Sequence, residues 1–291
     1  MVLADQALSQ AQEVMAGLKR VLADEFGIEH TTIQFEGQSC GQGPVVCVGP
    51  QSAPNGPPTL LAVFAHPDDE TFRCGGTLAL LARRGVRVQV LTATRGQAGD
   101  CGDPPLCTPE ELPAVRDQEL RCACAALGIE PPRILDYRDG TLAEVDAEGL
   151  IAAILDLVRE VHPQVMLSFG PDGLSGHPDH IAIGRCAAEA FRRASDVAEL
   201  YTVAVPRSVA ERLGMGRVRS VPDEEIALTV DAMPVWEQKM AAMRCHATQG
   251  GASPLTQAPE EQQRLFFGTE HFVRAAVRQP ERDFLGAVLR G

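Results

Sequence analysis

The sequence of 291 residues is poor in positive charge. Its 26 lysine and arginine residues stand against 39 acidic residues, which leaves a net charge of −13. Because binding to nucleic acid requires a basic face, we expect no nucleic-acid partner. The sequence also lacks an apolar run near the roughly 20 residues of a membrane span. Its N-terminus lacks the basic start and apolar stretch of a signal peptide. We therefore expect a cytoplasmic protein with no membrane partner.

Paired cysteine motifs are also missing. The nine cysteines are odd in number and scattered, which argues against the disulfide framework of a secreted domain. Cys101 and Cys107 share a loop rich in glycine and proline, where they could form a bridge or bind a soft metal. No second pair of the CxxC type accompanies them, and we favour free thiols. Cys122, Cys124 and Cys186 fall in predicted helices, where we expect small, buried side chains.

What the sequence does contain is a regular alternation of apolar strands with helices. It predicts strands over residues 59–64, 86–93, 133–137, 164–169, 200–205 and 225–230. It predicts helices over 76–84, 109–127, 147–161, 178–193 and 232–244. Continuous apolar strands separated by helices indicate a mainly parallel sheet covered on both faces. The predicted fold class is therefore α/β and Rossmann-like. A nucleotide-binding function lacks support, because no GxGxxG motif follows the first strand.

The first 57 residues differ from the rest. Residues 5–26 have helical periodicity, residues 28–37 indicate a short strand, and residues 49–58 form a linker rich in glycine, proline and serine. These elements are too few for a core of their own. We therefore divide the chain into a small N-terminal α+β extension with its linker, residues 1–57, and a main domain, residues 58–291. The extension would pack on the main domain or pair with a second chain in a homo-oligomer.

Polar segments follow four consecutive predicted strands. They are AHPDDE at residues 65–70, TATRGQAGD at 92–100, YRDG at 137–140 and GPDGLSGHPDH at 170–180. The carboxyl ends of parallel strands lie at one edge of the sheet, and ligands of open α/β sheets bind there. We therefore expect the four segments to converge on one site.

The acidic residues of AHPDDE indicate a bound cation. Like charges at this density cost free energy unless a positive charge neutralises them. A histidine nitrogen and a carboxylate suit Zn²⁺ or another divalent transition metal, and catalytic zinc sites use about three protein ligands with one position open. His66 and Asp69 would supply two ligands, and His177 or His180 the third. The alternative is a hydrogen-bonded loop at AHPDDE and a helix N-cap at HPDH.

These segments resemble the PIG-L-type, or LmbE-like, metal-dependent N-deacetylases. The resemblance covers about residues 57–291. It rests chiefly on AHPDDE and GHPDH, with support from TRGQAG, RDQELRCACAALGI, YRDG, RCHATQ and TEHF. It implies a hydrolase that removes the acyl group from an N-acetylated amino sugar of the N-acetylglucosamine type by attack of a metal-bound water. The implied partner is a small-molecule amino sugar. The implied cofactor is one divalent metal, Zn²⁺ first, with Fe²⁺, Co²⁺ or Ni²⁺ as alternatives.

The resemblance also implies roles for individual residues. His66, Asp69 and His180 would be the metal ligands. Asp68 would be the general base, since a ligating carboxylate has its lone pair occupied and a second, free carboxylate must move the proton. His177, as an imidazolium, would donate to the oxyanion and protonate the leaving amine. The alternative for His177 is a structural loop histidine.

Further residues would support this centre. Glu70 and Asp179 are expected to orient histidine rings and the adjacent backbone without touching the metal. Arg95, Arg116 and Asp139 would bind sugar hydroxyls or orient carboxylates.

Four further residues could have a purely structural role. An ion pair between Arg116 and Glu119 on a helix face is an equal alternative to substrate binding. His246 and His271 are expected to be structural histidines.

Two positions depart from the pattern of the family. Ser175 stands where some members have a tyrosine that helps to hold the oxyanion, and Gln97 stands where an acid is common. Neither change removes a ligand, but both leave the substrate open. An amidase acting on a thiol-sugar conjugate is therefore the first alternative. A catalytically silent metal-binding or metal-sensing protein is the second, and the intact Asp68 argues against it. Residues 17–40 faintly resemble the cytoplasmic domain of cation-diffusion-facilitator transporters, which dimerises.

Overall fold

The computed structural model describes residues 16–17, 19–20, 24, 57–216, 218–250, 256–278 and 283–290. The chain divides into two units, Met1–Ala53 and Pro54–Gly291. The described residues of the first unit are helical, within the helix predicted over 5–26. The predicted strand over 28–37 lies outside the described residues. The division at residue 57 and the pairing of chains through the extension stay predictions.

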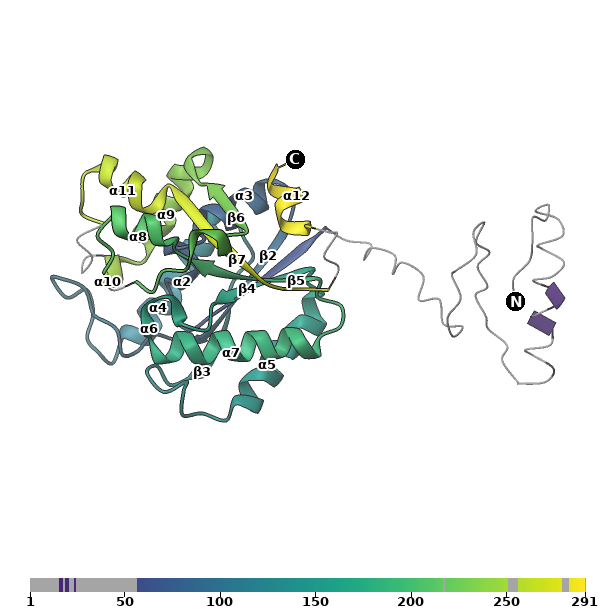
Figure 1. Cartoon of the computed structure of the whole chain (residues 1–291). Coiled ribbons are helices and arrows are strands. Elements are labelled where there is room, and N and C mark those ends of the chain that lie inside the picture. The colour runs from purple at the N-terminus through teal and green to yellow at the C-terminus, as the bar shows by residue number, and fades with distance from the viewer. Residues whose placement is uncertain are drawn as a thin grey trace. The chain divides into compact units, whose positions relative to one another are not determined.

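Seven strands of the second unit form one sheet in the described part of the chain (Figure 1). The strands are β1 (Thr59–Phe64), β2 (Arg87–Thr94), β3 (Arg133–Tyr137), β4 (Val165–Phe169), β5 (Glu199–Ala204), β6 (Leu228–Asp231) and β7 (Thr269–Val277). Their order is β3-β2-β1-β4-β5-β7-β6. The first five strands in this order pair in parallel, and β7 is antiparallel to both β5 and β6. The predicted α/β fold with a mainly parallel sheet is confirmed.

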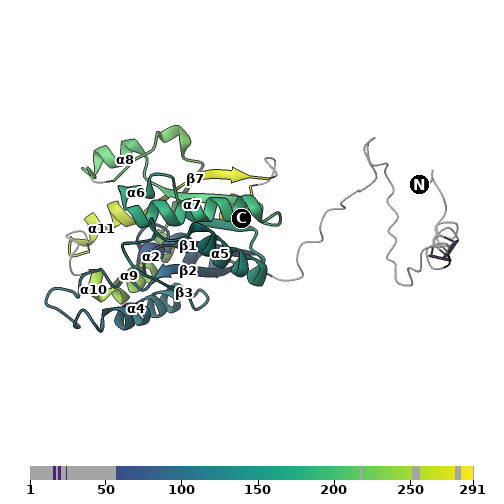
Figure 2. The ribbon, with the colours of Figure 1, turned by 90° about the horizontal axis from the view of Figure 1, so that it is seen from below.

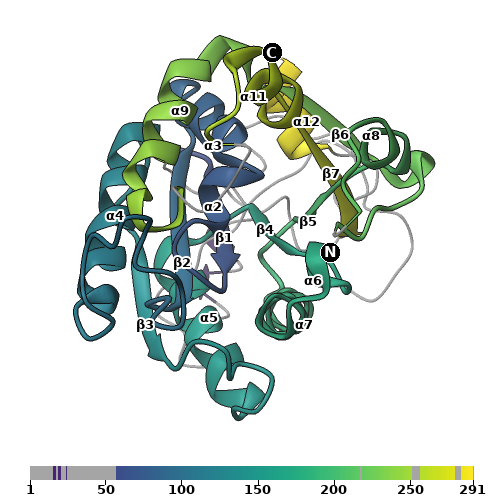
Figure 3. The same ribbon diagram turned by 90° about the vertical axis from the view of Figure 1, so that its left-hand side faces the viewer.

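Helices cover both faces of the sheet. The longer ones are α3 (Gly75–Arg83), α4 (Leu112–Leu127), α5 (Ala147–Val161), α7 (Pro178–Arg193), α9 (Trp236–Cys245) and α11 (Glu260–Phe267). The shorter ones are α2 (Asp69–Phe72), α6 (Gly173–Gly176), α8 (Arg207–Arg212), α10 (Ala247–Gly250) and α12 (Phe284–Arg290), with 3-10 turns at Asp223–Glu225 and Met233–Val235. Helices α3, α4 and α9 pack together on one face, and α5 and α7 on the other (Figure 3). Figure 2 shows α5 and α7 in front of the sheet.

Burial and helix capping explain why β1, α5 and α7 form where they do. All six residues of β1, TLLAVF, are buried, as expected for a strand covered on both faces. Helix α5 begins after Asp146, whose side chain accepts the N–H of Glu148, and it buries one apolar stripe. Helix α7 begins with Pro178, which suits the first helical position.

The end of the sheet formed by β5, β7 and β6 differs from the prediction. Strand β7 and helices α8, α11 and α12 were not predicted, and the strand predicted over 225–230 is Leu228–Asp231. The sequence of β7, TEHFVRAAV, carries a glutamate, a histidine and an arginine, and its burial is mixed. It therefore lacks the apolar run that marks the parallel strands.

The strand order reverses between β1 and β4. Strands β2 and β3 extend from β1 in one direction, and β4 and β5 extend in the other. Ligands of open α/β sheets bind beyond the carboxyl ends of the strands at such a switch point. AHPDDE follows β1 and leads into α2, while GPDGLSGHPDH follows β4 and forms α6 and the start of α7 (Figure 3). The two segments therefore flank the switch point.

Helix α7 approaches β4 closely at Gly184. A Cβ atom at this position would lie 2.7 Å from the carbonyl oxygen of Phe169, closer than real Cβ contacts come. Glycine therefore allows the helix to rest directly on the end of the strand. His180 lies one turn earlier in the same helix, so its position follows from this contact.

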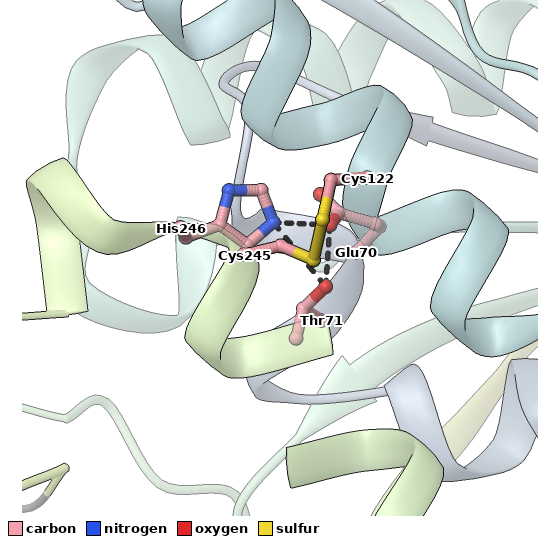
Figure 4. Close-up of a disulfide and its surroundings, with 5 residues drawn as sticks. All are labelled: Glu70, Thr71, Cys122, Cys245 and His246. Carbon is pink, nitrogen blue, oxygen red and sulfur yellow. Dashed lines mark hydrogen bonds and ion pairs between the residues drawn. A yellow bond between two sulfur atoms is a disulfide. The ribbon is translucent and has the colours of Figure 1, made fainter. Parts of the chain in front are cut away.

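One prediction about the cysteines is wrong. Cys122 is exposed on α4 and forms a disulfide with Cys245 at the end of α9 (Figure 4). The two are 123 residues apart in sequence, and only the packing of α4 against α9 brings them together. Cys124 and Cys186 are buried free cysteines, as predicted, and Cys101 and Cys107 are free.

Among the described residues, no helix has both the length and the apolar character that crossing a membrane requires.

Candidate metal and catalytic centre

The rings of His66 and His180 meet at the switch point. Nδ1 of His66 and Nε2 of His180 lie 3.2 Å apart. The carboxylate of Asp69 lies beside both, with Oδ1 3.2 Å from Nε2 of His180 and Oδ2 3.7 Å from Nδ1 of His66. Asp69 is held there by the backbone N–H groups of Ala65 and His66, which donate to its Oδ2. The structure thus brings the three predicted ligands together.

The opposite nitrogens of the two rings face hydrogen-bond acceptors. Nε2 of His66 lies 2.9 Å from Oδ1 of Asp139 and 3.3 Å from Oδ2 of Asp179. Nδ1 of His180 lies 3.1 Å from the carbonyl oxygen of Gly173. In the tautomers that could bind a metal at the facing nitrogens, Nε2 of His66 and Nδ1 of His180 donate to these acceptors. In the neutral rings, the two nitrogens that face each other then carry lone pairs.

The acidic surroundings draw positive charge to the ring pair. Burial alone would lower the pKa of His66, but its hydrogen bonds with Asp139 and Asp179 and the charge of Asp69 outweigh burial and raise the pKa to about 10. Burial is likewise outweighed at His180, whose pKa is raised by the charge of Asp69. The pKa of Asp69 is lowered, because the two histidines outweigh its burial. The site therefore favours a cation.

The donor set fits a divalent transition metal. Two imidazole lone pairs that face each other repel unless a cation lies between them. Ligand nitrogens about 2.0–2.1 Å from a tetrahedral ion would lie about 3.3 Å apart, close to the separation found here. Nearby donors could complete such a set, since possible ligand atoms of His66, His177 and His180 lie within 4.8 Å of one another, as do those of His66, Asp139 and Asp179.

Asp68 directly precedes Asp69 in the sequence and binds a different partner. Its carboxylate is 21% exposed, and its Oδ2 lies 3.2 Å from a guanidinium nitrogen of Arg116. Burial raises the pKa of Asp68 to about 6, against the opposing charge of Arg116. Its backbone has φ 118°, a conformation that residues other than glycine rarely adopt. Asp68 therefore presents a carboxylate that can accept a proton near neutral pH.

Arg116 is buried against Asp68, so the alternative ion pair with Glu119 is wrong. Its guanidinium donates to the carbonyl oxygens of Gly96 and Pro67 as well as to Asp68. A Cβ at position 96 would lie 2.2 Å from this guanidinium, so only glycine leaves it room. Glu119 instead accepts from the backbone N–H and the hydroxyl of Thr248.

His177 is both the N-cap of α7 and part of the cluster. Its Nδ1 accepts the backbone N–H of Asp179 at 3.2 Å. Its ring centroid lies 4.9 Å from that of His66 and 4.8 Å from that of His180. Burial and the two neighbouring histidines lower the pKa of His177. The ring is therefore neutral at neutral pH and offers an Nε2–H donor, rather than the imidazolium that the sequence led us to expect.

Asp179 and Asp139 tie the YRDG segment to the ring of His66. The carboxylate of Asp179 is fully buried and accepts the backbone N–H groups of Gly140 and Leu142 in addition to its contact with His66. Asp139 accepts the N–H of Ala98 from the segment after β2. All four predicted polar segments thus meet at one edge of the sheet.

Two predicted site residues point away from the cluster. Arg95 forms ion pairs with Asp117 and Asp136. Glu70 is fully buried and faces His246, whose Nε2 lies 2.7 Å from its Oε1 (Figure 4). Sequence reasoning assigned no site role to His246, because a histidine that follows a distant helix gives no sign of the element it will contact.

The carbonyl of Gly173 was also missed, because backbone atoms carry no signature in a sequence. The positive φ of Gly173, 65°, shows why a glycine stands at this turn.

A small cavity lies next to α2, and the residues that line it do not include those of the centre. Its volume is about 90 Å³, and it is lined in part by Phe72, Arg73, Ala204 and His271. Phe72 ends α2, the helix that begins with Asp69. The cavity therefore lies beside the segment that carries the centre.

Solved structures share this fold. An N,N'-diacetylchitobiose deacetylase from Pyrococcus horikoshii aligns with a TM-score of 0.52 and 19% identity over 93% of this chain and 94% of that one. The 4-carboxy-2-hydroxymuconate hydratase from Pseudomonas putida aligns with a TM-score of 0.57 and 20% identity over 78% of this chain and 99% of that one. The names of these two proteins describe different reactions, so the likeness shows the fold alone.

Sequence comparison gives more specific relatives. The family model described as GlcNAc-PI de-N-acetylase, PIG-L, matches residues 61–191. A protein from Acidothermus cellulolyticus named 1D-myo-inositol 2-acetamido-2-deoxy-alpha-D-glucopyranoside deacetylase is 35% identical over 74% of this chain and 88% of its own length. A protein of the same name from Mycobacterium sp. (strain JLS) is 34% identical over 79% of this chain and 87% of its own length. The chain therefore belongs to the GlcNAc-PI de-N-acetylase (PIG-L) family.

Proposed function

We propose that this protein is a metal-dependent hydrolase that removes the acetyl group from an N-acetylated amino sugar, by attack of water activated at a divalent ion. The sugar is of the GlcNAc type, in line with the names of its relatives. One observation carries the proposal: Nδ1 of His66 and Nε2 of His180 lie 3.2 Å apart beside Asp69, next in sequence to the separate carboxylate of Asp68. A site that only stored metal would not need this additional base.

His66, Asp69 and His180 would hold the ion, most simply Zn²⁺. Bound there, it would polarise the acetamide carbonyl and lower the pKa of a coordinated water from about 15.7 towards 7. Asp139 and Asp179 would keep the ring of His66 in the required tautomer, and the carbonyl of Gly173 would do the same for His180.

Asp68 would take the proton from the attacking water and pass it to the nitrogen of the leaving amine as the C–N bond breaks. Its pKa, raised by burial to about 6, leaves it ionised at neutral pH and still basic enough to accept a proton. Arg116 would fix the direction of this carboxylate, since its guanidinium is already bound to Asp68 and to two backbone carbonyls. We therefore assign Arg116 to Asp68 rather than to a sugar hydroxyl.

His177 would donate to the oxygen of the acetamide as negative charge develops on it. Its Nδ1 is occupied by the N–H of Asp179, which leaves the proton on Nε2 free to donate. This assignment matters more in this chain, because Ser175 stands near the position where some family members have a tyrosine.

The test compares two variants that remove different parts of the centre. Asp68→Asn should keep its metal content and lose turnover by about 10²-fold or more, because it removes the base alone. His180→Ala should lose both metal and turnover. Metal is measured by mass spectrometry, and amine release is measured with a panel of N-acetylated sugars, including GlcNAc-inositol. Equal turnover of the wild type and Asp68→Asn at matched metal content would exclude the assigned base.

A further inference from the structure

A buried acid and histidine lie directly behind the candidate base, and the mechanism above does not use them. Glu70 and His246 are both 0% exposed. Nε2 of His246 lies 2.7 Å from Oε1 of Glu70, which also accepts the hydroxyl of Thr71 (Figure 4). A buried carboxylate needs such partners, because an isolated charge in the interior is costly. The pair is therefore held as a unit.

This unit contacts the backbone of Asp68. Oε2 of Glu70 accepts the N–H of Asp68 at 3.0 Å. Asp68 has the positive φ of 118°, and residues other than glycine keep such a conformation only when their surroundings hold it. On the other side of the residue, the carbonyl of Asp68 accepts the N–H groups of Thr71 and Phe72. Glu70 therefore supplies the bond that holds the N–H of the strained residue.

The carboxylate of Asp68 is held by a different element. Arg116, which binds this carboxylate, lies in α4. His246 follows immediately after the last residue of α9. Asp68 is thus held at its side chain from α4 and at its backbone, through Glu70, from the end of α9.

The disulfide joins these two elements. Cys122 lies in α4, six positions after Arg116, and Cys245 lies directly before His246. Figure 4 shows the sulfur bridge beside the contact between His246 and Glu70. The covalent link therefore fixes the spacing between the two groups that hold Asp68.

We propose that Glu70 and His246 are positioning residues for Asp68, and that the Cys122–Cys245 disulfide makes their effect dependent on redox state. The proposal rests on the function proposed above, in which Asp68 is the base. A dithiol reductant would deliver two electrons and two protons, break the bond between the sulfurs to give two thiols, and become a cyclic disulfide itself. The end of α9 would then lose its covalent link to α4, and Asp68 would be held less precisely.

The first experiment removes the histidine. His246→Ala should lower kcat by at least about tenfold with KM within about twofold, because a misplaced base affects the reaction more than binding. His246→Gln should recover most of kcat, since its amide N–H can still donate to Glu70. Metal content should be equal in all three proteins. A fall in thermal stability with unchanged kcat would show a merely structural role and overturn the proposal.

A second readout does not need turnover. Hydrogen exchange of the peptide covering residues 65–72 should be faster in His246→Ala than in the wild type, and His246→Gln should restore its protection. If the wild type proves inactive on every sugar while this exchange pattern holds, the proposed function fails and the positioning stands. Unchanged exchange in His246→Ala would overturn the positioning.

The third experiment reduces the disulfide. A dithiol such as dithiothreitol should lower kcat of the wild type by about threefold or more, reversibly on reoxidation, as loss of precise placement predicts. Cys122→Ser and Cys245→Ser should begin at the lower value and not respond. Cys186→Ser, which removes a free buried cysteine of α7, should behave as the wild type. Full reduction, verified by thiol titration, with unchanged kcat would exclude the redox dependence.

Discussion

At the scale of single residues, hydrogen-bond partners decide what each histidine of the centre can do. At His180, Nδ1 faces the carbonyl oxygen of Gly173, and the ring is a candidate metal ligand through Nε2. At His177, Nδ1 accepts the backbone N–H of Asp179, and the ring is a candidate hydrogen-bond donor through Nε2. The difference follows from the polarity of one neighbouring group, because an acceptor places the proton on one nitrogen and a donor places it on the other.

The role of His177 can be tested separately from its role as a helix cap. His177→Asn keeps a side-chain oxygen that can accept the N–H of Asp179, but it removes the imidazole. We expect turnover to fall by about 10²-fold with unchanged metal content and little change in thermal stability. His177→Ala should lose the same activity and also about 1 kcal/mol of stability. Turnover of His177→Asn equal to the wild type would remove this residue from the mechanism.

The sequence predicted where polar residues gather more reliably than where each one points. His66, Asp69 and His180 meet, because each stands at the end of a strand or in the first turn of the helix behind one. Glu70 and Arg95 also stand in two of the four polar segments, yet Glu70 turns towards His246 and Arg95 towards Asp117 and Asp136. The direction of a side chain depends on distant partners that local sequence does not reveal.

At the scale of elements, β7 does more than extend the sheet. Its Glu270 accepts the backbone N–H groups of Gly76 and Thr77 at the start of α3, and it binds the buried ammonium of Lys239. One carboxylate thus caps a helix and neutralises a charge from α9. A strand that the sequence did not predict therefore anchors two predicted helices.

Glu270→Gln tests this anchor. The amide would present an N–H where donors already point and would leave Lys239 buried without a countercharge, so we expect the free energy of unfolding to fall by about 3 kcal/mol. Denaturant titration measures the change. The control is Glu260→Gln, which removes an exposed ion pair with Arg264 and should change stability little. Similar losses in both variants would contradict the anchoring role.

His271, also in β7, predicts a dependence of stability on pH. Burial lowers the pKa of His271, and the nearby charges of Arg73 and Arg212 act in the same direction. The unfolded chain therefore binds a proton more readily, and the free energy of unfolding should fall as pH drops from about 6.5 towards the lower folded pKa.

The comparison with His271→Gln isolates this contribution. Above pH 6.5 the stability difference between the two proteins should be constant, because the ring is neutral in both states. Below it, the wild type should lose stability relative to the variant by at most about 1.4 kcal/mol per pH unit. Parallel stability curves between pH 5 and 7 would show that His271 does not contribute.

At the scale of the whole molecule, the architecture was predictable where the hydrophobic pattern of the sequence alone determines an element. The expected bounds of β1, β3, α5 and α7 match the structure, because continuous apolar strands and amphipathic helices leave clear patterns. The antiparallel pairing of β7 and the Cys122–Cys245 disulfide were missed, because both depend on how helices and strands pack in the tertiary structure.

Removal of the metal should affect the molecule as well as its activity. An ion that binds only the folded chain stabilises it by about 2.7 kcal/mol at a hundred times its dissociation constant. We expect a chelator to abolish turnover and lower the melting temperature, and added Zn²⁺ to restore both. His180→Ala serves as control and should show no shift with the chelator. An unchanged melting temperature in the wild type after verified metal loss would contradict this coupling.

The separation of 114 residues between His66 and His180 has a consequence for biosynthesis. As a ribosome makes the chain, the first imidazole emerges long before the second, and β4 must join β1 before the two can meet. A nascent chain that ends before β4 would contain His66 and Asp69 but not His180, and we expect it to bind the ion weakly. Under the proposed assignment, metal loading comes late and reports that the centre of the sheet has been assembled.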